Sequence, residues 1–131
     1  MIKLIYCLRR LPQLTREDFQ RHWREIHGPM VKKHAKVLKI QHYIQIHTKD
    51  SAFNEAARAA RGAPEPYDGV AELCWKSYEE MTAAFSSPAG QKAAAELLED
   101  EKLFIDLSKS PVWTTPEEHV FVGNARAGNK S

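Results

Sequence analysis

The sequence is poor in cysteine, with two in 131 residues. Cys7 and Cys74 lie far apart within apolar segments, so they form neither a disulfide framework nor a Cys-x-x-Cys metal or redox motif. We expect both to be buried thiols. No apolar run approaches the roughly 18–20 residues that span a bilayer, and the N-terminus lacks the regions of a signal peptide. These absences predict a cytoplasmic protein with no membrane partner.

Motifs for several enzyme classes are also absent. The sequence has no Gly-x-Ser-x-Gly elbow, no glycine-rich phosphate loop and no dinucleotide fingerprint, which disfavours nucleophilic, phosphoryl-transfer and hydride-transfer chemistry. Acid–base chemistry, for which histidine and tyrosine are suited, remains.

Neither sign of charge predominates, since the net charge is only +2. A local basic run lies near the end of a predicted helix, where cations complement the helix dipole: Lys32, Lys33, His34, Lys36 and Lys39. A solvated helix end explains this run, and a phosphate or nucleic-acid patch is the alternative. No aromatic residue interleaves with these lysines as a single-strand binder requires, so we expect no nucleic-acid partner.

What the sequence does contain is one domain of alternating strand and helix patterns, over residues 1–122. Strands are predicted at 2–9, 40–47, 69–75 and 119–122. One helix follows the N-cap Thr15 and is interrupted by a kink or short break at Gly28-Pro29. Two further helices follow Ser77 and Ser87-Pro88. Residues 103–113 read as an irregular segment, and 123–131 as a frayed tail.

The predicted order is β-α-β-β-α-β, an α+β ferredoxin-like arrangement with a four-stranded antiparallel sheet. Helices then cover one sheet face, and a second subunit is the usual cover for the other. Residues 51–66 predict an exposed helix plus a loop, which is either a surface insertion or the cover of a pocket mouth.

The densest group of unusual residues runs from Phe19 to Pro29 and contains two histidines. His22 and His27 are five residues apart, so on an α-helix they point roughly 140° from each other. A zincin helix instead places two histidines four residues apart on one face. This spacing disfavours a metal site.

Several short motifs resemble the EthD family of small α+β barrel proteins, from about residue 2 to 122. They are Arg9-Arg10-x-Pro12, Phe19-x3-Trp23-x3-His27-Gly28-Pro29, Tyr43-x-Gln45-x-His47, Tyr67-Asp68-Gly69-Val70-Ala71-Glu72-Leu73-x-Trp75 and Glu118-His119-Val120. The Trp-x3-His-Gly-Pro element is the most specific. His42 stands where a basic residue is more usual, and Ile46 where the family is often polar.

The resemblance implies a homodimer, a dimeric α+β barrel whose subunits each keep a pocket between sheet and helices. It also implies a role in degrading small organic compounds, or in cyclising, decarboxylating or isomerising aromatic and polyketide-like molecules, without metal or organic cofactor.

Candidate site residues follow from this pattern. His27 is the candidate acid–base group, although a structural histidine that ties down the Gly-Pro break is the alternative. Tyr43, Gln45 and His47 share one strand face, so their polar groups converge. Tyr43 and His47 are the further catalytic candidates. The candidates for substrate binding are Trp23, Gln45, Glu72, Trp75 and His119.

The main hypothesis is a cofactor-independent enzyme acting on an aromatic or polyketide-like molecule. The alternative is a non-catalytic binding protein that carries a hydrophobic compound for a partner oxygenase. A third possibility is a haem-handling protein with an axial histidine.

Overall fold

The computed structural model describes residues 1–123, and their elements alternate along the chain. The strands are β1 (Ile2–Leu8), β2 (His42–His47), β3 (Gly69–Trp75) and β4 (Val112–Thr115). The helices are α1 (Arg16–His22), the π-helix η1 (Trp23–His27), α2 (Gly28–His34), α3 (Ala52–Arg61), α4 (Tyr78–Ser86), α5 (Pro88–Glu101) and the 3₁₀-helix η2 (Leu107–Lys109). No helix among these residues combines the length and apolarity needed to cross a membrane.

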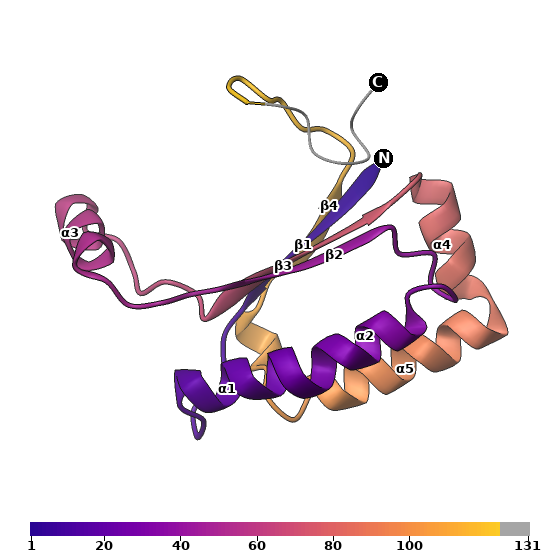
Figure 1. Ribbon diagram of the computed structural model, residues 1–131, viewed down its shortest axis with the longest axis horizontal. Coiled ribbons are helices and arrows are strands. Elements are labelled where there is room, and N and C mark those ends of the chain that lie inside the picture. The colour runs from indigo at the N-terminus through magenta and orange to yellow at the C-terminus, as the bar shows by residue number, and fades with distance from the viewer. Residues whose placement is uncertain (124–131) are drawn as a thin grey trace.

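The four strands form one antiparallel sheet in the order β2-β3-β1-β4. Helices α1, α2, α4 and α5 lie on one face of this sheet, and the other face has no helical layer (Figure 1). The predicted ferredoxin-like α+β fold is therefore confirmed.

The predicted N-caps begin three of these helices. The side-chain oxygens of Thr15, Ser77 and Ser87 each accept a hydrogen bond, at 3.0 Å, from the backbone N–H three residues later. These bonds satisfy one of the N–H groups that the first turn of a helix leaves unpaired. Pro88, in the first turn of α5, has no N–H to satisfy there.

A kink or short break was predicted at Gly28-Pro29, and the structure shows a π-turn just before Gly28 and no break in the helix. The backbone stays helical at Gly28, whose N–H donates to the carbonyl of Trp23, five residues back. One wide π-turn thus precedes Pro29. Its wider hydrogen-bond spacing lets the helix continue although proline has no backbone N–H to donate. This turn changes which side chains of the helix face the sheet.

The last strand was predicted in the wrong place. Residues 112–115 pair with β1, from Tyr6 opposite Val112 to Lys3 opposite Thr115, and Pro116 ends the ladder. They occupy the free edge of β1, so residues 119–122 form no strand. Part of the segment expected to be irregular is therefore the edge strand. The predicted tail lies, beyond residue 123, outside the described residues.

Alternation along the strands gives the sheet two different faces. Leu4, Tyr6 and Leu8 of β1 share a face with Ala71 and Leu73 of β3, toward the helices. The core lies there, around the buried rings of Phe19, Trp23, Trp75 and Phe104. The outer face exposes 43% of Ile44, 47% of Ile46 and 48% of Trp113. Large apolar side chains thus lie on the face that has no helical layer.

Helix α3 stands clear of the rest of the molecule at the end of the β2–β3 connection (Figure 1). It begins at the N-cap Ser51, ends at Gly62 in the left-handed conformation, and has no buried residue. The exposed helix predicted between residues 51 and 66 is therefore present.

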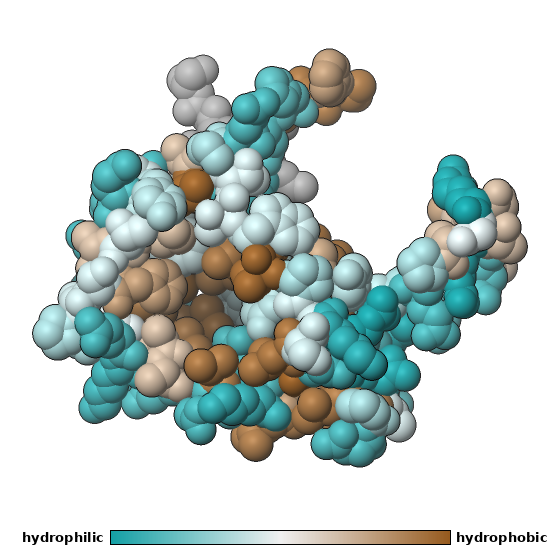
Figure 2. All heavy atoms as spheres, turned by 180° about the vertical axis from the view of Figure 1, so that it is seen from behind, coloured by the Kyte–Doolittle hydropathy of each residue, from teal (hydrophilic) through white to brown (hydrophobic). Residues whose placement is uncertain are grey.

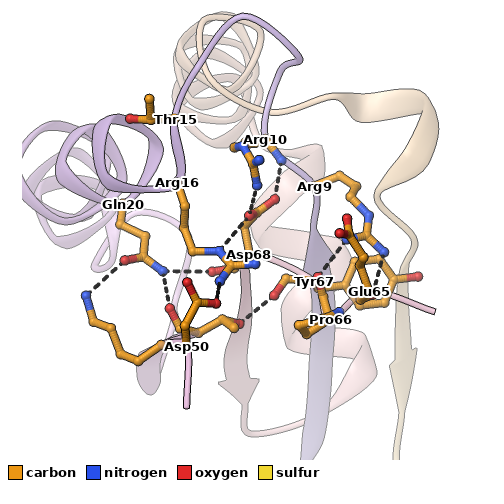
Figure 3. Close-up of polar contacts among 12 residues, drawn as sticks. Arg9, Arg10, Thr15, Arg16, Gln20, Asp50, Glu65, Pro66, Tyr67 and Asp68 are labelled. Atoms are coloured by element: carbon orange, nitrogen blue, oxygen red, sulfur yellow. Dashed lines mark hydrogen bonds and ion pairs between the residues drawn. The ribbon is translucent and has the colours of Figure 1, made fainter. Parts of the chain in front are cut away.

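A buried carboxylate anchors the base of this projecting segment. Asp68, fully buried, accepts hydrogen bonds from the Arg10 backbone N–H at 2.8 Å and from Arg16 Nε at 3.0 Å, and it also pairs with the Arg10 guanidinium (Figure 3). Burial alone would raise the pKa of Asp68, but these donors outweigh it and hold the pKa below the ordinary value. The cluster ties the end of β1 and the start of α1 to the start of β3.

Candidate functional site

A cavity of about 340 Å³ lies between the sheet and the helical layer. Its walls are mostly aliphatic and aromatic, including Leu4, Leu73 and Phe85, and hydrophobic side chains gather around a hollow between the two layers (Figure 2). Four titratable side chains also line it: Tyr6, His27, Tyr43 and Glu101. An apolar cavity with a few convergent polar groups is the usual form of a small-molecule site.

His27 is 6% exposed and is held from behind by a carboxylate at the end of α5. Its Nδ1 lies 2.8 Å from Asp100 Oδ2, within hydrogen-bond distance. A carboxylate oxygen accepts, so Nδ1 carries the hydrogen and Nε2 carries the lone pair. No hydrogen bond from the described residues reaches Nε2, and the nearest carboxylate oxygen, Glu101 Oε2, is 3.9 Å away.

The π-turn brings both histidines of this region to the same carboxylate. His22 Nε2 lies 3.0 Å from Asp100 Oδ1, beside the His27 contact. The expectation that these histidines point about 140° apart was wrong, because it assumed an α-helix. A π-turn closes its hydrogen bond over five residues and places residues five apart on one side. Within residues 1–123, no group of three His, Cys, Asp or Glu side chains is arranged to hold a metal ion.

Burial determines the charge of His27. Desolvation lowers its pKa, Asp100 raises it through the hydrogen bond and its charge, and His22 lowers it further. The net pKa lies below the ordinary 6.5, so the imidazole is neutral at pH 7. A neutral imidazole with its lone pair toward an apolar cavity has the state that a general base needs.

Glu101 and Tyr6 form a second pair beside this histidine. The Tyr6 hydroxyl donates to Glu101 Oε1 at 3.0 Å. Burial raises the pKa of Glu101, and the charge of Asp100 adds to this effect, although the Tyr6 hydrogen bond opposes it. Burial and Glu101 together raise the pKa of Tyr6 well above its ordinary value. Tyr6 also borders the cavity.

Tyr43, Gln45 and His47 share one face of β2, and hydrogen bonds link them. Gln45 Nε2 donates to the Tyr43 hydroxyl oxygen at 2.7 Å, and His47 Nε2 lies 2.8 Å from Gln45 Oε1. Only Tyr43 of the three lines the cavity. Burial raises the pKa of Tyr43 and lowers that of His47, where Arg24 and Lys49 act in the same direction.

The two tryptophans predicted at the site line the cavity. Trp75 is fully buried, and its indole N–H donates to the Leu38 carbonyl at 2.7 Å. Trp23 stacks on His47, with ring centroids 4.4 Å apart. Gly69 makes this packing possible, because a Cβ there would lie 2.3 Å from the Trp23 ring. Trp23 therefore lines the cavity and lies between the cavity and His47.

Glu72 and His119 lie on the other side of the sheet. Glu72 is 3.5 Å from Lys3 Nζ, and His119, largely exposed, contacts Glu117 at 2.7 Å. Both border a shallow depression on the outer face, so the structure does not bring them together with His27.

Sequence reasoning missed Asp100 and Glu101, which end α5. The helix carries an apolar stripe at Ala93, Ala94 and Leu97, and steps of three, four and seven residues extend this stripe to the two acids. The position of two carboxylates at the end of an apolar stripe could have indicated from the sequence that they border the core.

Comparison with known proteins places this geometry among related folds. The chain matches the EthD domain over residues 11–108. No curated protein matches it. Several solved structures are similar to it, including the following three, and at these identities they show the fold alone. An ethyl tert-butyl ether d (EthD) family protein from Bacillus halodurans has 16% identity and a TM-score of 0.60, with 90% of this chain and 99% of that chain covered. A dimeric protein of unknown function and ferredoxin-like fold from Bacteroides fragilis has 8% identity and a TM-score of 0.55, covering 87% and 93%. SnoaB, a cofactor-independent oxygenase from Streptomyces nogalater, has 10% identity and a TM-score of 0.52, covering 92% and 95%.

Proposed function

The chain belongs to the EthD family, and from that membership we propose that it is a cofactor-independent enzyme acting by acid–base chemistry on an aromatic or polyketide-like small molecule. The reaction would be a cyclisation or dehydration, an isomerisation or a decarboxylation. One observation carries the proposal. A neutral histidine is oriented by a buried carboxylate and lines an apolar cavity, and its Nε2 accepts no hydrogen bond from the described residues.

Each polar group of the cavity has a role in this proposal. His27 Nε2 takes a proton from the substrate, and Asp100 stabilises the imidazolium that forms, as the carboxylate of a catalytic triad does. Gln45 and Trp23 donate hydrogen bonds to the Tyr43 oxygen, so the hydroxyl hydrogen of Tyr43 is left to donate to a substrate oxygen. The hydrogen-bonded strand residues Gln45 and His47 position Tyr43 and do not touch the substrate.

A non-catalytic carrier of hydrophobic compounds is the second candidate, and the largely apolar lining of the cavity favours it. A carrier has no need of an oriented base. Its histidines would be hydrogen-bonded within the protein, whereas Nε2 of His27 has no such bond from the described residues. Saturable binding of a phenolic ligand without any chemical change would support the carrier.

The enzymatic proposal is tested by replacing His27 with glutamine and with alanine. We expect turnover of the substrate found by screening to fall by about 10²–10⁴-fold in both variants, the usual contribution of a positioned acid–base group. Circular dichroism and sedimentation check that the fold and the assembly remain. Full activity in both variants would exclude the acid–base role of His27.

We also propose that two copies assemble through the outer sheet faces. The exposed side chains of Ile44, Ile46 and Trp113 favour this, because large apolar side chains exposed on a sheet face without a helical layer are typical of an interface. The occupant is a second copy, as in the similar protein described as dimeric. Sedimentation should show a monomer for Ile44→Asp and a dimer for the control Tyr78→Asp, which changes an exposed residue of the helical layer. A monomeric wild type would contradict the proposal.

A further inference from the structure

The charges around the cavity are all of one sign. Of the residues that line it, Glu101 is the acid, and the described lining contains no lysine or arginine. Asp100, a second carboxylate, lies directly behind His27. The Tyr6 hydroxyl already donates its hydrogen bond to Glu101. An anion entering the cavity would meet two carboxylates and no cation.

Resting on the proposed function, we infer that this cavity takes uncharged carbonyl compounds and phenols and rejects carboxylic acids. A carboxylate that leaves water for an apolar site needs a cation or several N–H donors, because its desolvation is otherwise uncompensated. The cavity has one open hydroxyl, that of Tyr43, and a nitrogen lone pair on His27. Both suit the neutral oxygen and the acidic C–H or O–H of a ketone, ester or phenol.

Cations do occur nearby, but outside the cavity. Arg24 and Lys32 line a separate groove that shares Val31, Ile40 and Tyr43 with the cavity wall. Arg24 is paired there with Glu25 at 3.0 Å. Neither cation is among the residues that line the cavity, whereas His27 is. The groove therefore adds no cation to the lining around the acid–base group.

This selectivity narrows the reaction. Decarboxylation begins with a carboxylate at the reacting centre, and the lining disfavours that group. A proton transfer on a neutral carbonyl compound fits instead. His27 Nε2 takes a proton from the carbon next to the carbonyl, the C–H electron pair forms a C=C bond, and the carbonyl pair moves to the oxygen, which Tyr43 hydrogen-bonds. In a β,γ-unsaturated carbonyl compound the oxygen pair then re-forms the C=O bond, the C=C bond shifts by one carbon, and the γ-carbon takes the proton from the imidazolium. This completes an isomerisation without an oxidant or reductant.

The test compares ligands that differ in charge at one position. Methyl 4-hydroxybenzoate and 4-hydroxybenzoate share a ring and a phenol, and at pH 7 only the second carries a carboxylate. Binding would be followed by the fluorescence of Trp23 and Trp75, which line the cavity, and by calorimetry. We expect the ester to bind the wild-type protein about 100-fold more tightly than the acid, because a charge without a partner is costly in such a site.

Two variants identify the source of the discrimination. Glu101→Gln removes the carboxylate and keeps an acceptor for Tyr6, so the ratio of ester to acid affinity should fall about tenfold. Glu99→Gln is the matched control on the same helix, where the side chain is 70% exposed and pairs with Lys102, and its ratio should match the wild type. Thermal melting checks the fold of both variants.

The outcomes separate this inference from the proposed function. Equal affinity of the wild type for ester and acid would overturn the selectivity and leave the acid–base site standing. Failure of every neutral phenol, ketone and ester to bind would overturn the proposed function and the selectivity with it. An unchanged ratio in Glu101→Gln would contradict the role given to that carboxylate.

Discussion

Two of the carboxylate clusters in this small domain differ in their partners. Asp68 is surrounded by the guanidinium groups of Arg10 and Arg16, which carry a permanent charge (Figure 3). Asp100 and Glu101 are instead paired with histidines and a tyrosine, which can gain or lose a proton. Both clusters join distant parts of the chain, and only the second borders the cavity.

The difference shows how one residue type serves stability or chemistry. A carboxylate held by arginines has a lowered pKa and one fixed charge, so it can anchor loops but cannot exchange protons near neutral pH. When the partners of a carboxylate are neutral histidines or tyrosines, a proton can move between the carboxylate and these partners. Burial shifts the pKa of His27 down and that of Glu101 up, so their values approach one another.

The largest expected effect is on stability, at Asp68. Asp68→Ala leaves two arginines without their buried partner, which typically costs about 3–5 kcal/mol of unfolding free energy. Denaturant unfolding measures this loss, and turnover per folded molecule should not change. Asp50→Asn is the control, because Asp50 also pairs with Arg16 but its side chain is 90% exposed, so the loss should be below about 1 kcal/mol. Equal losses would contradict the distinction between the clusters.

The same cluster predicts a dependence of stability on pH. The pKa of Asp68 is lower in the folded state than its ordinary value of 3.8, so the unfolded state binds the proton more readily. The stabilisation by Asp68 is therefore complete above about pH 4 and is lost as the pH falls through the folded-state pKa. Unfolding of wild type and Asp68→Asn should differ most above pH 4 and converge in stronger acid. A difference that grows in acid would contradict this sign.

A smaller effect is expected at Asp100, on activity. Asp100→Asn removes the acceptor that fixes the Nδ1–H tautomer of His27, so kcat/KM should fall by about 100-fold, or about 2.7 kcal/mol. The acidic limb of the pH–rate profile should move further below pH 6.5, since Asp100 is the group that raises the pKa of His27 against burial and His22. Glu101, which accepts a hydrogen bond from Tyr6, lies 3.9 Å from Nε2 of the same ring, so the Glu101→Gln profile serves as the comparison. A limb that moves toward higher pH would refute the assignment.

The smallest effect is expected on the outer face. His119→Ala should change kcat/KM by less than about twofold, because the side chain is 67% exposed and contacts Glu117 instead of the cavity. Surface changes of this kind usually alter stability by no more than about 0.5 kcal/mol. Steady-state kinetics and thermal melting measure both. A large loss of turnover would show that the outer face takes part in the reaction.

Local chemistry in the sequence predicted much of the fold. Strand alternation and the capping residues Thr15, Ser77 and Ser87 are local signals, and the structure confirms them. The last strand was misplaced because Val120-Phe121-Val122 has the stronger β pattern. Pairing depends on which segment reaches the edge of β1, and that is not a local property.

The site could be predicted in part. Trp23, His27, Tyr43 and Trp75 line the cavity, as their positions on helix and strand faces suggested. Sequence spacing could not show that His22 and His27 share Asp100, because it assumed 3.6 residues per turn and the helix contains a π-turn. Glu72 was misjudged for another reason. Its strand has apolar residues on both faces, so alternation did not reveal that it faces away from the helices.

The protonation of His27 is the central claim, and ¹⁵N NMR of its imidazole tests it most directly. Spectra at pH 7 should show a neutral ring with the hydrogen on Nδ1, which is bonded to Asp100. Adding a neutral phenolic ligand should shift the Nε2 resonance and leave that of Nδ1 nearly unchanged. A ring that is protonated at pH 7, or an Nε2 resonance that no cavity ligand shifts, would contradict the account.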